Sequence, residues 1–196
     1  MFTASLLRRS RHCAVGLLLV LFATGVSAAD TTAVRDPYLI NPGDILTISV
    51  WKEPDLLREV QVNPDGLMSF PLAGDMLAAG RTVSQLQAEL TEKLGRLIPD
   101  ASVSVGTKFL NGNTIYVLGQ VNRPNIYQMF RPTDVMQAIS MAGGVTSFAD
   151  LNGIRVLRRD ENGKQVSIRF RYDDIRDGDK LAQNIVLRAG DTIVVP

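Results

Sequence analysis

Hydrophobic and polar residues alternate in several short stretches of the chain, which is typical of strands that bury one face. The pattern predicts a strand at residues 46–50 and a hairpin whose strands cover residues 60–62 and 67–70. Pro64 and Gly66 lie between these last two strands and supply the backbone angles of a tight reversal. The first ordered elements of the chain are therefore expected to be strands.

The first helical pattern begins at Thr82. This residue and Gln85, three positions later, have the sequence of a capping box, in which each side chain bonds the other residue's backbone N–H. Apolar residues then recur at spacings of three and four until Pro99 ends the helix, and a short strand with Val103 and Val105 facing inward follows. The apolar stripe is wide enough to cover one sheet face, so we expect it to pack as core. Its members are Val83, Leu86, Leu90, Leu94 and Leu97.

The second half of the chain repeats this order of elements. Strands are expected at residues 115–118 and 126–129, on either side of a turn at residues 122–125. A helix capped by Thr133 should follow and end at the glycine pair 143–144. Its inward-facing residues are Val135, Ile139 and Ala142.

A second hairpin is centred on the turn at residues 160–163. Its first strand covers residues 154–158, and its return strand alternates between two faces. Val166, Ile168, Phe170 and Tyr172 face inward, whereas Ser167, Arg169 and Arg171 face outward. One face should therefore pack and the other should be cationic. The chain ends in residues 190–196, whose Gly-Asp pair followed by apolar residues repeats residues 43–48.

These elements predict an α+β fold of two small domains, each a sheet with one helix laid across it. Hairpins predominate, and strands and helices do not alternate regularly. We place the domains at residues 37–108 and 113–196, with a break at Asn111 and Gly112. Units of this size have small cores and would gain from packing on one another or on copies of the chain.

Residues 1–29 have the order of a secretory signal peptide. Three arginines among residues 8–11 precede an apolar run at residues 14–23, which is shorter than the roughly 20 residues that a membrane-spanning helix needs. The small residues after the run suit cleavage after Ala28 or Ala29. We therefore expect the protein to be secreted through the inner membrane and to be soluble or peripheral once mature.

The mature chain, which would begin with a polar leader at residues 30–36, holds 18 Lys and Arg against 20 Asp and Glu. This net charge of about −2 gives no basic footprint, so we expect no nucleic acid partner. The only Cys and the only His lie in the signal, as Cys13 and His12. Disulfides, thiol or Ser-His nucleophiles and zinc sites with Cys or His ligands are thereby excluded from the mature chain.

Two sets of motifs resemble known domains. Residues 38–46, Trp51, the turn 63–66 and the run 70–74 resemble the polysaccharide export domain of outer-membrane export proteins. Residues 117–124, the segment 138–144 and the ending 190–196 are similar to a soluble-ligand-binding β-grasp (SLBB) domain. In that family the two domains occur in this order. The resemblance implies an N-terminal export domain of sheet and helix and a C-terminal β-grasp-like SLBB domain.

The resemblance also implies a role. Family members of this kind are periplasmic, form homo-oligomeric rings and work with an inner-membrane copolymerase to pass capsule or exopolysaccharide outward, with no catalysis and no cofactor. Longer members add a second SLBB domain and an outer-membrane helix, and many carry a lipid-bearing Cys at the mature start. This chain stops at Pro196 and has Ala29 or Asp30 at that start. We therefore expect a short form that associates with the outer membrane through a separate partner.

Five residues are candidate contacts to polysaccharide or to a neighbouring subunit. The arginines among them could meet an acidic polysaccharide through charge-assisted hydrogen bonds, or they could form a solvated face or subunit salt bridges. The turn that holds the other two could contact a partner, although Asn and Pro also explain it as turn chemistry. The five are Asn122, Arg123, Arg155, Arg169 and Arg171.

Other groups have a chemical and a structural interpretation. Trp51 and Tyr38 could stack on sugar rings, but we expect them to seal the core. The acidic residues between 173 and 179 do not have the spacing of a calcium loop, so we expect an acidic turn and no metal. No pair among the 20 acidic residues is singled out for glycoside hydrolysis, which disfavours an enzyme. The rival to an export component is a monomeric periplasmic module that binds a glycan or small solute.

Overall fold

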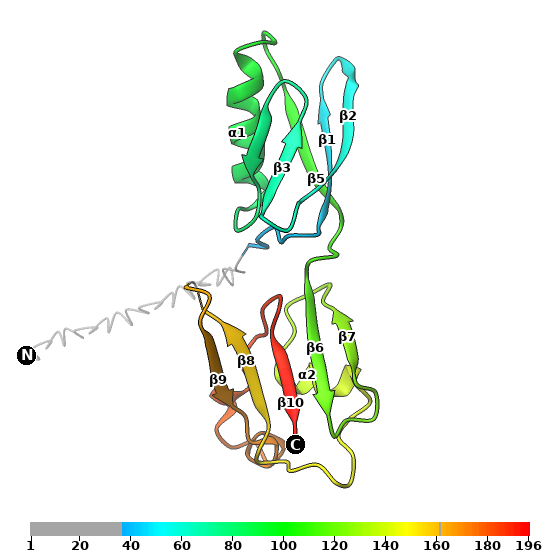
Figure 1. Cartoon of the computed structure of the whole chain (residues 1–196), viewed down its shortest axis with the longest axis vertical. Coiled ribbons are helices and arrows are strands. Elements are labelled where there is room, and N and C mark those ends of the chain that lie inside the picture. Colours follow the sequence, from blue (N-terminus) through cyan, green and yellow to red (C-terminus); the bar gives the residue numbers. More distant parts are fainter. Residues whose placement is uncertain (1–36, 161) are drawn as a thin grey trace, which may run out of the picture. The chain divides into compact units, whose positions relative to one another are not determined.

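The computed structural model describes residues 37–160 and 162–196. The expected signal peptide, its cleavage at Ala28 or Ala29 and the leader at residues 30–36 lie outside these residues. Strands and a few helices form two groups, one before and one after residue 110 (Figure 1). The predicted α+β class is confirmed.

The first group is a three-stranded antiparallel sheet with a helix on one face. Strands β1 (Ile45–Val50), β2 (Glu53–Gln61) and β5 (Val103–Phe109) lie in the order β2-β1-β5. Helix α1 (Val83–Gly95) packs its buried leucines against the alternate residues of β1 and β5 that face inward. A two-stranded hairpin, β3 (Leu67–Phe70) and β4 (Gly74–Leu77), completes this core.

The capping box at the start of α1 is confirmed. Thr82 Oγ1 accepts the N–H of Gln85 at 3.2 Å, and Gln85 Oε1 accepts the N–H of Thr82 at 2.9 Å. The end of the helix was predicted too late. The helix stops at Gly95, so Leu97 leaves the apolar stripe and is 61% exposed.

The hairpin predicted from residues 60–62 and 67–70 is wrong in its pairing. The turn exists, because Asn63 and Leu67 are joined by a backbone hydrogen bond of 2.8 Å, but β2 pairs with β1 along its length and β3 pairs with β4. Strand β2 is also longer than expected. The strand already begins at Glu53, in a stretch of the sequence that shows no alternation, and a register shift between Ile48 and Val50 of β1 accommodates this longer pairing.

The second group is a five-stranded mixed sheet. Its strands are β6 (Thr114–Gly119), β7 (Asn125–Gln128), β8 (Arg155–Arg159), β9 (Gln165–Arg169) and β10 (Thr192–Val195). They lie in the order β7-β6-β10-β8-β9, and only the β6–β10 pair is parallel. Helix α2 (Val135–Met141) packs against one face through Val135, Ala138 and Ile139.

Two details of the second group differ from the prediction. Asp134 caps α2 in place of Thr133, because its carboxylate accepts the N–H of Gln137 at 2.8 Å, while the buried Thr133 hydroxyl donates to the carbonyl of Arg131. Strand β9 ends at Arg169, and the chain turns into helix α3 (Tyr172–Arg176) and the single turn η1 (Leu181–Gln183). Two aspartates in the first turn of α3 favour its start, since carboxylates complement a helix N-terminus.

The repeated Gly-Asp sequence forms the same turn in both groups. Gly43 and Gly190 adopt φ values of +92° and +85°, which L side chains rarely adopt. In each turn the following aspartate is buried and accepts the N–H of the residue three positions earlier, at 2.9 Å for Asp44 and 2.8 Å for Asp191. Both turns feed directly into a strand, so they set which residues of β1 and β10 face the core.

Candidate functional site

The first sheet leaves one face uncovered by α1. Leu46, Ile48 and Val50 of β1 point into the core, so the alternate residues between them point away from the helix. Trp51 follows β1 and continues on this outward face, where its side chain is 72% exposed. The expectation that Trp51 seals the core is therefore wrong.

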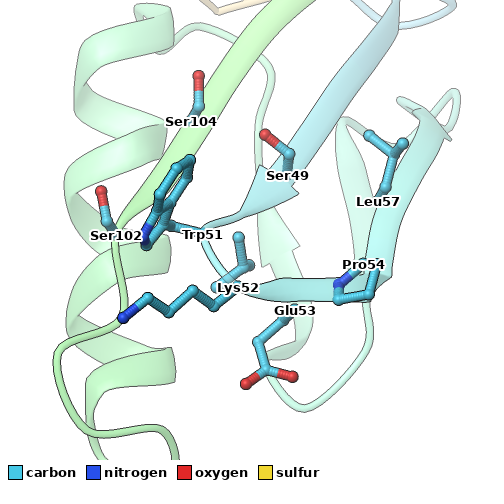
Figure 2. Close-up of a pocket in the computed structure, with 9 residues that line it drawn as sticks. Ser49, Trp51, Lys52, Glu53, Pro54, Leu57, Ser102 and Ser104 are labelled. Atoms are coloured by element: carbon cyan, nitrogen blue, oxygen red, sulfur yellow. The ribbon is translucent and has the colours of Figure 1, made fainter.

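Trp51 forms one wall of a shallow, solvent-open depression of about 390 Å³. Figure 2 shows its indole beside Ser102 and Ser104 of the β5 segment, with Leu57 of β2 on the far side and Ser49 between them. Lys52, Glu53 and Pro54 line the rim. The lining thus combines two exposed apolar side chains with three hydroxyls and one charge of each sign.

The backbone under the indole is fixed by neighbouring strands. The N–H of Trp51 donates to the carbonyl of Ser102 at 2.9 Å, which ties the β1–β2 turn to β5. Lys52, the next residue, has a φ of +66°, a conformation that costs a non-glycine residue about 1–2 kcal/mol. The surrounding pairing of β1 with β2 and β5 holds this turn in place.

Tyr38 belongs to a different environment. Its hydroxyl donates to Asp44 at 2.5 Å, and Asn41 Nδ2 donates to the Tyr38 oxygen at 3.0 Å. Burial and the hydrogen bond to Asp44 raise the pKa of the Tyr38 phenol above its ordinary value. The Tyr38 hydroxyl therefore holds the buried Asp44, but Tyr38 is half-buried and does not belong to the hydrophobic cluster of the first sheet, so the expectation that it seals the core is wrong.

Arg155 and Arg169 are brought together on the second sheet. They lie directly opposite one another on β8 and β9, and both are exposed on the face that points away from α2. Within residues 37–160 and 162–196, neither makes an ion pair. Like charges directly opposite on neighbouring strands repel, so this pair would be stabilised by an anion.

Arg171 does not join that pair. Its Nε donates to Asp174 at 3.1 Å, and Lys180 donates to the same carboxylate at 2.9 Å. The hydrogen bond from Lys180 and the charge of Arg171 hold the pKa of the Asp174 carboxyl below its ordinary value. Arg158, one of the nearby arginines, points inward to the buried Asp191.

Asn122 and Arg123 lie at the C-terminal end of α2. Asn122 Nδ2 donates to the carbonyl of Gly143 at 2.6 Å, and Arg123 Nη2 donates to the carbonyl of Met141 at 3.3 Å. These carbonyls lack helical partners, so the two side chains act as a cap. A contact with polysaccharide or a subunit by Asn122 or Arg123 stays a prediction.

The acidic residues between 173 and 179 are largely engaged in ion pairs. Asp173 and Asp177 both contact Arg176, at 2.9 and 3.1 Å, and Asp174 contacts Arg171 and Lys180. In the part of the chain that the structure describes, no group of three or more His, Cys, Asp or Glu residues is placed to hold a metal ion. The cluster behaves as a salt-bridged turn between β9 and β10.

The exposure of Trp51 could have been inferred from the sequence by parity. Residues 46, 48 and 50 alternate inward, so residue 51 is expected on the outward face. The general tendency of tryptophan to be buried outweighed that local signal. The serines beside it could not have been found in this way, because Ser102 precedes β5 and Ser104 lies on β5, about 50 residues later in the chain, and the sequence does not specify what β5 pairs with.

Comparison with known proteins supports the two-domain description. Residues 32–108 match the family described as polysaccharide biosynthesis/export protein, and residues 114–169 match the SLBB domain. No helix within the described residues is long and apolar enough to cross a membrane.

Three curated relatives illustrate the similarity. The EPS I polysaccharide export outer membrane protein EpsA of Ralstonia solanacearum is 31% identical over 68% of this chain and 41% of its own length. The polysialic acid transport protein KpsD of Escherichia coli is 29% identical over 88% of this chain and 30% of its own. The capsule polysaccharide export protein BexD of Haemophilus influenzae is 26% identical over 79% of this chain and 42% of its own.

The chain therefore spans less than half the length of these relatives. The two matched segments follow one another and together account for most of the residues that the structure describes. The chain belongs to the polysaccharide biosynthesis/export family, with an export domain followed by an SLBB domain.

Proposed function

We propose that the protein is a component of a machine that exports capsule or exopolysaccharide, and that it acts without catalysis. The observation that carries this proposal is the succession of an export domain and an SLBB domain in one chain. The relatives with this similarity bear the names of polysaccharide export or transport proteins. A conduit needs polar walls that bind weakly, which agrees with a shallow depression and exposed charged strands.

The location and partners form part of the same proposal. A signal peptide at residues 1–29 would deliver the protein to the periplasm, where it would associate with the outer membrane through a separate partner. The domains would cover residues 37–108 and 113–196. Each is small, so a homo-oligomeric ring would add buried surface, and an inner-membrane copolymerase would supply the polymer.

The function is tested by a clean in-frame deletion in a strain with no second gene of the family. Polysaccharide in the medium and on the surface is quantified against polysaccharide retained in the cell, with and without complementation by the intact gene. Loss of the exported fraction, restored by complementation, is the expected result. Unchanged export would contradict the proposal and favour the monomeric glycan-binding module, for which the Trp51 depression is the supporting observation.

Arg155 and Arg169 are proposed as the contact for acidic groups on the polymer. The double variant Arg155→Gln and Arg169→Gln should weaken binding of an oligogalacturonate in low salt, while Arg96→Gln, which removes an exposed arginine elsewhere, should not. If the wild type, the double variant and Arg96→Gln bound the oligogalacturonate equally, Arg155 and Arg169 would not be the contact for acidic groups.

A further inference from the structure

We propose that the Trp51 depression is a binding site for one pyranose ring of a neutral saccharide, which stacks on the indole. This inference deepens the proposed function, because it rests on a saccharide being the molecule that passes the protein. It names a site on the export domain that is distinct from the arginine pair of the second sheet.

The apolar half of the depression matches the C–H face of a sugar ring. An indole that is 72% exposed leaves a broad apolar surface in water, and such surface is stabilised when another apolar face covers it. Leu57, 57% exposed, lies across the depression from the indole and would contact the ring edge (Figure 2). Trp51 lies in the β1–β2 turn and Leu57 lies on β2, so the turn and the pairing of β2 with β1 set the distance between the two side chains.

The polar half matches the hydroxyls of the same ring. Ser49, Ser102 and Ser104 each offer one donor and two acceptor positions, which is the complement of sugar hydroxyls that donate and accept in turn. Lys52 and Glu53 on the rim carry opposite charges and add no net charge to the site. A neutral sugar is therefore favoured over an acidic one here.

The backbone of the site is organised before any ligand arrives. The hydrogen bond from the Trp51 N–H to the Ser102 carbonyl fixes the backbone of these two residues beneath the indole, and the β1–β5 ladder pairs Ser49 with Ser104. A preformed site loses little conformational entropy on binding. The depression is shallow, however, so a polymer that stacks on it can also leave, which a transport path requires.

Trp51 is the only tryptophan in the chain, so its fluorescence reports from the site alone. Purified protein would be titrated with the neutral hexasaccharides cellohexaose, mannohexaose and maltohexaose, with emission and saturation-transfer NMR recorded in parallel. We expect a saturable shift in emission with at least one of them, insensitive to salt because the contact is apolar. Absence of a saturable response to all three would overturn the proposal.

Variants locate the response. Trp51→Ala should reduce saturation transfer to the sugar by roughly tenfold or more, whereas Trp51→Phe, which keeps a ring, should retain part of it. The matched control is Phe148→Ala, because Phe148 is also exposed, at 84%, and lies on the other domain. Because Trp51 is exposed, its loss should leave the fold intact, and circular dichroism checks this. Wild-type transfer in Trp51→Ala would refute the site.

The inference and the proposed function fail separately. If no hexasaccharide binds but deletion of the gene abolishes export, the site is wrong and the function stands. If the sugar binds at Trp51 but deletion leaves export unchanged, the site stands and the export role is wrong. A Trp51 emission that shifts with protein concentration and not with sugar would mark the depression as a contact between copies of the chain and overturn the proposal.

Discussion

Gly119 ends β6 at the point where β6 pairs with β10 in parallel, and it should be among the least replaceable residues of the second domain. Its φ is +94°, and a Cβ placed there would lie 1.9 Å from the carbonyl oxygen of Val195. That oxygen accepts the N–H of Gln120 at 2.7 Å, and the Val195 side chain is buried. An added methyl group must therefore displace the end of β10.

The magnitude follows from three effects. The left-handed backbone costs an alanine about 1–2 kcal/mol. Moving β10 by more than 1 Å breaks the bond to Gln120 and weakens the neighbouring ladder, at about 1 kcal/mol for each hydrogen bond. Loosening the packing of Val195 adds a fraction of its burial energy. Gly119→Ala should then lower the free energy of unfolding by about 3–5 kcal/mol.

Gly190→Ala is the matched control in the same domain. Gly190 has a φ of +85°, but a Cβ at this position meets no atom within 4 Å. Only the backbone cost of about 1–2 kcal/mol applies to it. Urea unfolding followed by circular dichroism measures both variants. If Gly119→Ala and Gly190→Ala lowered the free energy of unfolding by the same amount, within about 0.5 kcal/mol, this would refute the argument that position 119 needs glycine because of steric contact with Val195.

Three further changes test the core and its polar anchors, each by urea unfolding. Arg158→Met leaves the carboxylate of Asp191, which is 1% exposed, without its counter-charge, and should lower the free energy of unfolding by about 3–5 kcal/mol. The loss should be smaller in the double variant Arg158→Met and Asp191→Asn, because the buried carboxylate is then neutralised as well. Thr82→Ala removes the cap of α1 and should cost about 1 kcal/mol, while a loss near zero would mean that Gln85 caps alone. Leu90→Ala empties a fully buried position and should cost about 2–5 kcal/mol; a loss below 1 kcal/mol would show that α1 packs loosely.

Local patterns in the sequence predicted the elements that short-range physics determines. The alternation of residues 46–50, the capping box at Thr82 and the hairpin around residues 160–163 each need only neighbours within a few positions. The structure confirms these elements for that reason. The predicted cap at Thr133 failed by one residue because two neighbouring side chains can both cap, and the buried position of Thr133 decided between them.

Pairings between distant segments could not be predicted in the same way. The first part of β2, residues 53–59, has a proline and several exposed polar residues in place of alternation, so only its pairing with β1 defines it as a strand. The parallel pairing of β6 with β10 joins residues more than 70 positions apart and has no turn signal. The opposed arginines are a contrasting case, because Arg155 and Arg169 belong to one hairpin and its short turn sets their register.

The two Gly-Asp turns show how one local sequence takes different tertiary roles. In both, a left-handed glycine turns the chain and a buried aspartate binds the N–H three residues earlier. The second oxygen of each carboxylate needs a further donor, because burial removes water from it. Asp191 receives the guanidinium of Arg158 across the sheet, so it fixes β8 against β10.

Asp44 receives neutral donors from outside its sheet. Tyr38 donates from the segment before the turn, and the N–H of Gly112 donates at 2.9 Å from the segment after β5. A Cβ on Gly112 would lie 2.3 Å from the carbonyl oxygen of Pro42, so the close approach requires glycine. The segment at Asn111 and Gly112, where the sequence predicted the domain break, is therefore bonded to the Gly43-Asp44 turn of the export domain. The buried carboxylate of Asp44, which shapes the start of β1, also fixes where the chain leaves that domain.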